Sequence, residues 1–182
     1  MVFLYFYLSI TNFFKKIKIF ILKKYGLKIG SSCFISNDTF FDPSFLHLIE
    51  IGNNVTITAN VKILAHDSST KMHMGLTRIG RVKIENNVFI GMGSIILPNI
   101  TIGPNSIIGA GSVVTNDVPC GVVVGGNPAR VICSLEDFLK KHWDNISRSP
   151  QFDNRYLISS GITPELANEM LVSLKDSQGY II

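Results

Sequence analysis

The sequence repeats with a period of six residues, and this period constrains the fold more than any other feature. From residue 84 onward, consecutive hexads each begin with an aliphatic residue; they read IENNVF, IGMGSI, ILPNIT, IGPNSI, IGAGSV and VTNDVP. Hexads of the same kind begin earlier at Ile51, Ile57 and Ile63, and a weaker pair begins at Ile29 and Ile35. The period is not the roughly 3.6 residues of an amphipathic helix, but six contains period two, so each hexad can supply a short strand.

Residues that favour turns mark the junctions between hexads. Gly, Asn, Asp and Pro recur there, and each suits the backbone conformations of tight turns. A strand and a turn in every hexad indicate a β-solenoid, in which three hexads form one triangular coil and stacked coils hydrogen-bond at roughly 4.8 Å per layer. We therefore predict an all-β solenoid over residues 29–132, with the first residue of each hexad pointing into a continuous apolar column.

The repeat is interrupted between Ile63 and Ile84. Their spacing is not a multiple of six, and the segment DSSTKMHMGLTR within it is polar and has no aliphatic residue in register. We predict an excursion loop over residues 67–79, with His66 at its root. Long loops in compact folds are often functional, which makes His66 a candidate functional residue. The alternative is a histidine that bonds a loop carbonyl.

Charge and cysteine content argue against several classes of protein. The formal net charge is +4, and six of the 17 basic residues lie between Lys15 and Lys28. No basic stripe runs through the body of the chain, so nucleic-acid binding is not expected. The three cysteines are far apart and form no CxxC pair, which predicts a reduced, cytoplasmic protein without a cysteine zinc site.

The first 28 residues form a basic, amphipathic segment for which we predict a helix. It reads MVFLYFYLSITNFFKKIKIFILKKYGLK and lacks the charged start and cleavage site of a signal peptide. Its uncharged run ends at Lys15, short of the ~20 residues that cross a bilayer. Two interpretations stay open. The segment packs on the solenoid or on a neighbouring subunit, or residues 1–25 lie on the inner face of the membrane with lysines against anionic lipid.

After residue 132 the hexads stop, and we predict a helical tail over residues 133–182. The first helix reads SLEDFLKKHWDNI with Ser134 as N-cap, and the second reads TPELANEMLVSLK with Thr163 as N-cap and Pro164 in the first turn. An uncapped solenoid end exposes core and unpaired strand edges. The helices are therefore predicted to cover that end or to pack on a neighbour.

The regular hexads and the residues after them resemble the hexapeptide-repeat acyltransferases. The segment that carries the resemblance reads IGMGSIILPNITIGPNSIIGAGSVVTNDVPCGVVVGGNPARVI, and the resemblance extends from about Gly30 to Ile132. It is similar to the branch of the maltose, galactoside and capsule or colanic-acid O-acetyltransferases, and ILAHDSST is similar to the active-site segment of its polysaccharide O-acetyltransferases. The resemblance implies a left-handed parallel β-helix, a homotrimer with active sites between subunits, and acetyl-CoA as co-substrate, with no metal.

Acetyl transfer from a thioester to a sugar hydroxyl needs few protein groups. The hydroxyl must lose its proton as it attacks, and a histidine imidazole, which titrates near neutral pH, suits that task. The resemblance maps the family's catalytic histidine onto His66. A backbone N–H at Met92 or Gly93 is a candidate donor to the oxyanion of the tetrahedral intermediate. Coenzyme A leaves as a thiolate, so no nucleophilic side chain is required.

Other residues are assigned to the imidazole and to the acceptor. Glu50 lies 16 residues before His66 and so about one coil below it, which makes it a candidate carboxylate for orienting the imidazole. The candidates for acceptor binding are Asp42, Asp67 and His73. Asp42 maps onto an acceptor contact of related enzymes, Asp67 could also cap the turn beside His66, and His73 lies on the excursion.

The coenzyme A site follows from the resemblance alone. The positions that match the family's cofactor contacts are Phe89, Gly91, Met92, Gly93, Gly109, Ala110, Thr115, Asn116 and Arg130. Small residues among them let a ligand approach the backbone, although tight solenoid corners would need them too. Asn116 stands in place of a family lysine, so Arg130 is the remaining cation for the nucleotide phosphates.

The sequence thus predicts an acetyl-CoA-dependent O-acetyltransferase for a sugar or surface-polysaccharide precursor. One alternative is a small non-sugar acceptor, or N-acetylation of an amino sugar. A zinc hydratase on the same solenoid would need three convergent histidines, and the excursion supplies at most two. The other alternative is a non-catalytic solenoid scaffold, which would have no use for a histidine at the root of an excursion.

Overall fold

The computed structural model describes residues 17–182. Residues 1–16, which include most of the predicted membrane segment, lie outside the described residues. The chain forms two compact units that divide after Leu135. The first contains the solenoid and the second contains the C-terminal tail.

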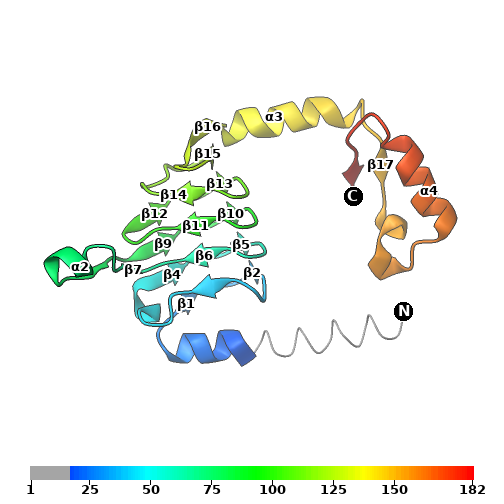
Figure 1. Cartoon of the computed structure of the whole chain (residues 1–182). Coiled ribbons are helices and arrows are strands. Elements are labelled where there is room, and N and C mark those ends of the chain that lie inside the picture. Colours follow the sequence, from blue (N-terminus) through cyan, green and yellow to red (C-terminus); the bar gives the residue numbers. More distant parts are fainter. Residues whose placement is uncertain (1–16) are drawn as a thin grey trace. The chain divides into compact units, whose positions relative to one another are not determined.

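Three parallel sheets form the walls of the solenoid (Figure 1). The first sheet contains β1 (Lys28–Ile29), β4 (Ile49–Ile51), β9 (Val82–Ile84) and β12 (Ile100–Ile102). The second contains β2 (Phe34–Ile35), β5 (Thr56–Ile57), β10 (Phe89–Ile90), β13 (Ile107–Ile108) and β15 (Val122–Gly125), with β16 (Arg130–Ser134) antiparallel at its edge. The third contains β3 (Phe40–Phe41), β6 (Lys62–Ile63), β11 (Ile95–Ile96) and β14 (Val113–Val114). Successive strands step from sheet to sheet, so the chain is a parallel β-helix, as the hexads predicted.

The register places the first residue of each hexad directly above its equivalent in the coil below. Ile90, for example, pairs with Ile57 on one side and with Ile108 on the other. From Ile51 onward these residues are at most 2% exposed and form the predicted column, whereas Ile35 is 4% exposed and Ile29, in the first strand, is half-buried. The members of the column are Ile51, Ile57, Ile63, Ile84, Ile90, Ile96, Ile102, Ile108 and Val114. Full burial of such side chains stabilises a fold by roughly 1.5–3 kcal/mol each, so the column contributes strongly to the stability of the solenoid.

Asparagines hold the corner where the chain passes from the first sheet to the second. Asn54, Asn87 and Asn105 have positive φ angles of 54°, 58° and 56°. Asparagine adopts this left-handed region more readily than other residues with a Cβ atom. Their side chains also bond from coil to coil, because Asn54 Nδ2 donates to Asn87 Oδ1 at 2.9 Å and Asn87 Nδ2 donates to Asn105 Oδ1 at 2.9 Å.

Replacing Asn87 with alanine should lower the free energy of unfolding by about 2–3 kcal/mol, because the variant loses two hydrogen bonds and strains a left-handed residue. Asn87→Gly is the matched control, since it loses the same bonds but tolerates the positive φ; we expect a loss of about 1 kcal/mol. Urea denaturation at one fixed protein concentration measures both. Equal losses for the two variants would contradict a backbone contribution at this corner.

The excursion from the solenoid wall forms an arm that contains a strand pair and a short helix. β7 (His66–Asp67) pairs antiparallel with β8 (Arg78–Ile79), and the short helix α2 (Lys71–Met74) lies between them (Figure 1). The Gly80 N–H donates to the Ala65 carbonyl at 3.0 Å, which closes the base of the arm. A second insertion, the 3₁₀ helix η1 (Leu46–Leu48), lies between β3 and β4.

A helix over residues 17–24 covers the N-terminal end of the solenoid. Its Ile19 and Leu22 pack against the core, and Leu27 behind it is 2% exposed. Within residues 17–182, no helix has both the length and the hydropathy to cross a membrane.

The C-terminal unit contains short helices and one pair of short strands. Its elements are α3 (Leu135–Ile146), β17 (Gln151–Phe152), η2 (Asn154–Tyr156), η3 (Ile158–Ser160), α4 (Pro164–Ser173) and β18 (Tyr180–Ile181). β17 pairs in parallel with β18. Phe152 in β17 is 6% exposed, and its ring centroid lies 5.0 Å from that of Tyr156. Thr163 caps α4 as predicted, because its Oγ1 accepts from the Leu166 N–H at 3.3 Å.

Candidate active site

His66 and Asp42 form a dyad at the root of the arm. Asp42 directly follows β3, and its N–H donates to the Ile63 carbonyl at 3.0 Å. This rung of the third sheet places Asp42 one coil below the start of the arm. There the Asp42 Oδ2 atom bonds to the Nδ1 atom of His66. The Asp42 side chain is 0% exposed, whereas that of His66 is 36% exposed, so the imidazole connects a buried carboxylate to the surface.

Backbone amides fix the Asp42 carboxylate. The Ala65 N–H donates to Oδ2 at 3.0 Å, and the Ser44 N–H donates to Oδ1 at 3.2 Å. A buried carboxylate needs such partners, because its transfer out of water is otherwise very costly. With the carboxylate on Nδ1, that nitrogen carries the hydrogen of the neutral imidazole, and Nε2 becomes its basic nitrogen. Phe45 packs beside the imidazole with its ring centroid 5.5 Å away.

The structure corrects two predictions about carboxylates. Glu50 does not orient the imidazole; its Oε2 lies 3.5 Å from Lys28 Nζ and 3.7 Å from Arg81 Nη2 on the outer face of the first sheet. The prediction assumed regular coils, but η1 lengthens the first coil, so the residue beneath the imidazole is Asp42. Asp42 is also not an acceptor contact, because its side chain is fully buried beneath the imidazole.

Asp67 and His73 lie on the arm. Asp67 caps the turn as predicted: its Oδ1 accepts from the Ser69 N–H at 2.9 Å, and its Oδ2 accepts from Arg78 Nη2 at 2.8 Å. Hydrogen bonds from Ser69, and then the nearby Arg78 guanidinium, hold the pKa of Asp67 below its usual value. His73 lies in α2 and is exposed. Acceptor binding by Asp67 and His73 stays a prediction.

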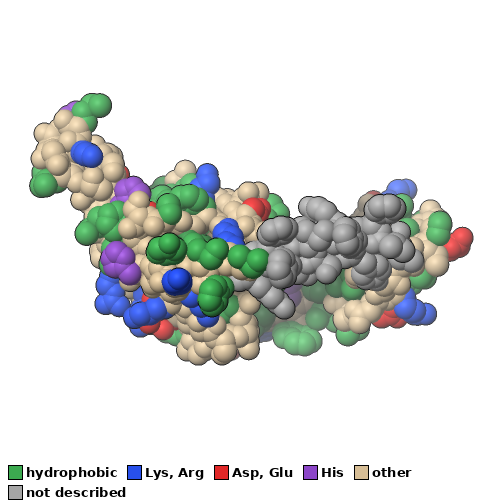
Figure 2. Space-filling model, turned by 90° about the horizontal axis from the view of Figure 1, so that it is seen from below, with side chains coloured by type: hydrophobic (Ala, Val, Ile, Leu, Met, Phe, Trp, Pro, Cys, Tyr) green, Lys and Arg blue, Asp and Glu red, His purple; other side chains and the backbone are tan. Residues whose placement is uncertain are grey.

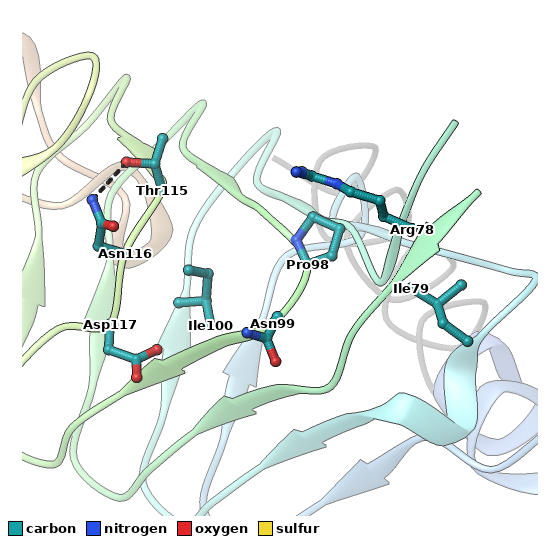
Figure 3. Close-up of a pocket in the computed structure, with 8 residues that line it drawn as sticks. All are labelled: Arg78, Ile79, Pro98, Asn99, Ile100, Thr115, Asn116 and Asp117. Atoms are coloured by element: carbon teal, nitrogen blue, oxygen red, sulfur yellow. Dashed lines mark hydrogen bonds between the residues drawn. The ribbon is translucent and has the colours of Figure 1, made fainter. Parts of the chain in front are cut away.

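A groove with a volume of about 650 Å³ begins at the arm (Figure 3). It is lined by Arg78, Ile79, Pro98, Asn99, Ile100, Thr115, Asn116 and Asp117. Ile79 is the strand partner of His66, so the groove reaches the strand beside His66, although neither His66 nor Asp42 lines it. Pro98 follows β11 and Thr115 follows β14, so the groove runs from coil to coil along the corner between the third and first sheets. Two predicted cofactor residues, Thr115 and Asn116, therefore share this groove with the root of the arm.

The other predicted cofactor residues lie elsewhere on the chain. The turns at Gly91–Gly93 and at Gly109–Ala110 follow β10 and β13, at the corner between the second and third sheets. Phe89 is on the outer face of the second sheet and is 42% exposed. Arg130 lines a smaller pocket of about 280 Å³ together with Asn116. The turn residues of the predicted set thus lie on two corners, which the third sheet separates, while Phe89 and Arg130 lie in strands β10 and β16.

The amides at the second corner differ in their partners. The Gly93 N–H donates to the Ala59 carbonyl at 2.9 Å, so of the two alternative oxyanion donors this one is already bonded. Met92 stays the candidate. A Cβ atom on Gly91 would lie 2.5 Å from the Ala110 nitrogen, so coil stacking by itself accounts for a glycine at that position.

Comparisons with known proteins decide the family. Residues 81–116 match the family model described as bacterial transferase hexapeptide (six repeats). Protein CapG of Staphylococcus aureus is 47% identical over 129 residues, which are 68% of this chain and 75% of CapG. The chain belongs to the hexapeptide-repeat acyltransferases. These enzymes share the coil architecture described above.

Solved structures agree with this assignment to the acyltransferases. A maltose O-acetyltransferase from Clostridium difficile is 42% identical, with a TM-score of 0.55 over 60% of this chain and 59% of that chain. A hexapeptide-repeat acetyltransferase from Vibrio cholerae, solved in complex with acetyl coenzyme A, is 32% identical, with a TM-score of 0.55 over 60% of this chain and 61% of that chain.

The sequence analysis did not predict that the segment Asp42–Phe45 supports His66 in this acyltransferase. A signal was present, because Phe41 is six residues after Ile35 and so begins a hexad. Asp42 then follows the first residue of its hexad just as Leu64 follows Ile63 in the coil above.

Among residues 17–182, no group of three or more His, Cys, Asp or Glu side chains is placed to hold a metal ion.

Proposed function

We propose that this acyltransferase is an acetyl-CoA-dependent O-acetyltransferase that acts on a hydroxyl of a sugar or surface-polysaccharide precursor. The observation that carries the proposal is the dyad: a buried Asp42 bound to Nδ1 of His66, beside the strand at which a groove along the coils begins. The acetyl coenzyme A in the Vibrio cholerae relative supports the donor. The sugar named for the Clostridium difficile relative supports the acceptor class.

The geometry supports direct transfer of the acetyl group from coenzyme A to the acceptor, without an acetylated enzyme. The acceptor hydroxyl donates to His66 Nε2 and loses its proton to that nitrogen as its oxygen attacks the thioester carbonyl. Asp42 stabilises the imidazolium that forms, and an amide such as that of Met92 stabilises the oxyanion. The tetrahedral intermediate then collapses, the C–S bond breaks, and the thiolate of coenzyme A takes the proton from the imidazolium. The acetyl ester and the free thiol are the products.

The site is completed between subunits of a homotrimer in this proposal. The turn residues of the predicted cofactor set lie on two corners of one solenoid, so a neighbouring copy can bring the Met92 corner of one chain to the dyad of another. Apolar surface for such a contact is present on the second sheet, where Phe34 is 55% exposed, and on the arm, where Met72 is 89% exposed. We also propose that the β-helix is left-handed, as in the family, and that the protein is cytoplasmic.

Thiol release from acetyl-CoA, measured with and without a panel of sugars, tests the function. We expect release that depends on a neutral or acidic sugar, and a product whose mass increases by one acetyl group as an alkali-labile ester. An alkali-stable product from an amino sugar would indicate N-acetylation instead. No release with any acceptor class, from a protein that is folded and binds no coenzyme A, would favour the scaffold.

Arg130 gives a prediction about the donor. Arg130→Ala should raise the KM for acetyl-CoA by about tenfold or more with a smaller effect on the acceptor KM, because a charge-assisted phosphate bond contributes roughly 1.5–3 kcal/mol. Arg130→Lys keeps the charge and should recover part of the loss. Steady-state kinetics with each substrate varied separates the two effects. An unchanged KM for acetyl-CoA in Arg130→Ala would place the phosphates elsewhere.

A further inference from the structure

The helix over residues 17–24 is fixed to the end of the solenoid by apolar packing and by two lysines. Ile19 and Leu22 pack against the core. Lys18 Nζ donates to the Asn37 and Thr39 carbonyls at 2.7 and 2.8 Å, and burial lowers the pKa of this amine. Lys23 Nζ donates to the Ile29 carbonyl at 3.1 Å. The orientation of the helix, and therefore its outer face, is set by these contacts.

The outer face of this helix is apolar as well. Phe20 is 70% exposed, Tyr25 69%, Ile21 45% and Ile17 40%, and Lys24 is exposed beside them. Figure 2 views the molecule from this end and shows hydrophobic side chains among lysines and arginines. A surface helix of a globular protein normally turns polar residues outward. Because this helix has apolar residues on both faces, its outer face is suited to contact with something other than water.

The chemistry of this part of the chain indicates what that contact is. Residues 1–14 carry no charge and include six Phe and Tyr residues, and they lead directly into the lysine-rich helix. Six lysines lie between residues 15 and 28, and Asp38 is the first acidic residue of the chain. Lys28 pairs with Glu50, and Lys18 and Lys23 bond backbone carbonyls, but Lys24 is exposed beside the aromatic and aliphatic groups of this face. Such a face matches the boundary between headgroups and acyl chains of an anionic bilayer. We propose that the N-terminal end of the solenoid binds an anionic membrane surface.

The dyad lies close to this membrane-binding end. Lys18 holds the carbonyl of Thr39, three residues before Asp42, and the Asp42–His66 contact joins the first coil to the second. Coils stack at about 4.8 Å, so the imidazole is about two layers, roughly 10 Å, from the end of the solenoid. If the proposed function holds, the acceptor class that this placement favours is a glycan carried on a lipid. Its sugar would be held about 20 Å above the bilayer, because the helix over residues 17–24 adds roughly 10 Å to the two layers.

Vesicle flotation of the full chain tests the membrane contact, with phosphatidylcholine vesicles that contain or lack phosphatidylglycerol. We expect the protein to float with the anionic vesicles, to stay behind with the neutral ones, and to be released by high salt, which screens charge. The double variant Phe20→Ser, Tyr25→Ser should bind anionic vesicles at least about tenfold more weakly, because it loses two aromatic anchors. The matched control is Leu171→Ser, Val172→Ser, which removes two side chains with 72% and 69% exposure from the C-terminal unit and should float as the wild type does.

Other outcomes would overturn the proposal. If the full chain does not float with anionic vesicles, the face does not bind membrane. If the Phe20, Tyr25 variant floats normally but sediments as a smaller species, a second copy of the chain covers the face. The test is independent of the proposed function: acetylation of a water-soluble acceptor should be equal in the variant and the wild type, and flotation without transfer to any acceptor would refute the enzyme activity while leaving the membrane contact intact.

Discussion

Alanine in place of His66 should reduce kcat at least about 100-fold while the dissociation constant for acetyl-CoA stays within a few-fold. A positioned general base typically contributes ~10²–10⁴-fold to a rate. In the proposed function the imidazole acts on the proton of the acceptor and makes no bond to the coenzyme. Thiol release measures turnover, and calorimetry with coenzyme A measures binding.

The matched control for this experiment is His47→Ala. His47 is exposed in η1 and its ring lies 6.3 Å from that of Phe45, but it makes no part of the dyad. The His47→Ala variant should retain most of the turnover of the wild type. A loss of less than ~10-fold in His66→Ala, below the range for a general base, would show that another group removes the proton.

Asparagine in place of Asp42 should reduce kcat by about 10²–10⁴-fold although it preserves the size of the side chain. An amide that donates to Nδ1 leaves the imidazole hydrogen on Nε2, and Nε2 then has no lone pair for the acceptor proton. The KM for acetyl-CoA should change little, because Asp42 is buried and touches neither substrate. Near-ultraviolet circular dichroism and thermal melting establish that the variant folds, since the Ala65 and Ser44 amides each lose or weaken a bond in it.

The combination of both changes distinguishes a positioning role from general damage. If Asp42 acts only through the imidazole, the double variant Asp42→Asn, His66→Ala should be no slower than His66→Ala alone, because residues that act as a unit are not additive. Multiplicative losses would mean that Asp42 supports the enzyme by a separate route, through the backbone of the arm.

The sequence predicted the walls of the solenoid well because stacking imposes its period on every coil. A residue such as Ile90 must lie above Ile57 and below Ile108, so the hexads alone locate the strands and the core. His66 was found for a related reason, since it stands where the period fails. Both results depend on spacing along the chain, which is visible without coordinates.

The partner of His66 could not be located by spacing alone. The position of Asp42 depends on how many residues η1 adds between β3 and β4, and nothing in the hexad pattern gives that number. The arm was also incompletely predicted, because the pairing of β7 with β8 involves only two residues on each side. The polar composition of the arm predicted that it is exposed, but not that it contains a strand pair and a short helix. The hexad pattern likewise did not show that the turns with predicted cofactor residues lie on two different corners, because that depends on how the coils wind.

The winding also sets a length scale. The groove passes Ile79, Pro98 and Thr115 in turn, at one corner of successive coils, so each added layer lengthens it by about 4.8 Å. The dyad, by contrast, is built entirely from the first two coils and the arm that leaves them. If the proposed function holds, the number of coils beyond the arm therefore sets how long a ligand can lie extended from the imidazole. A solenoid of this kind can change the reach of its groove by inserting or deleting whole coils without disturbing the groups that perform the chemistry.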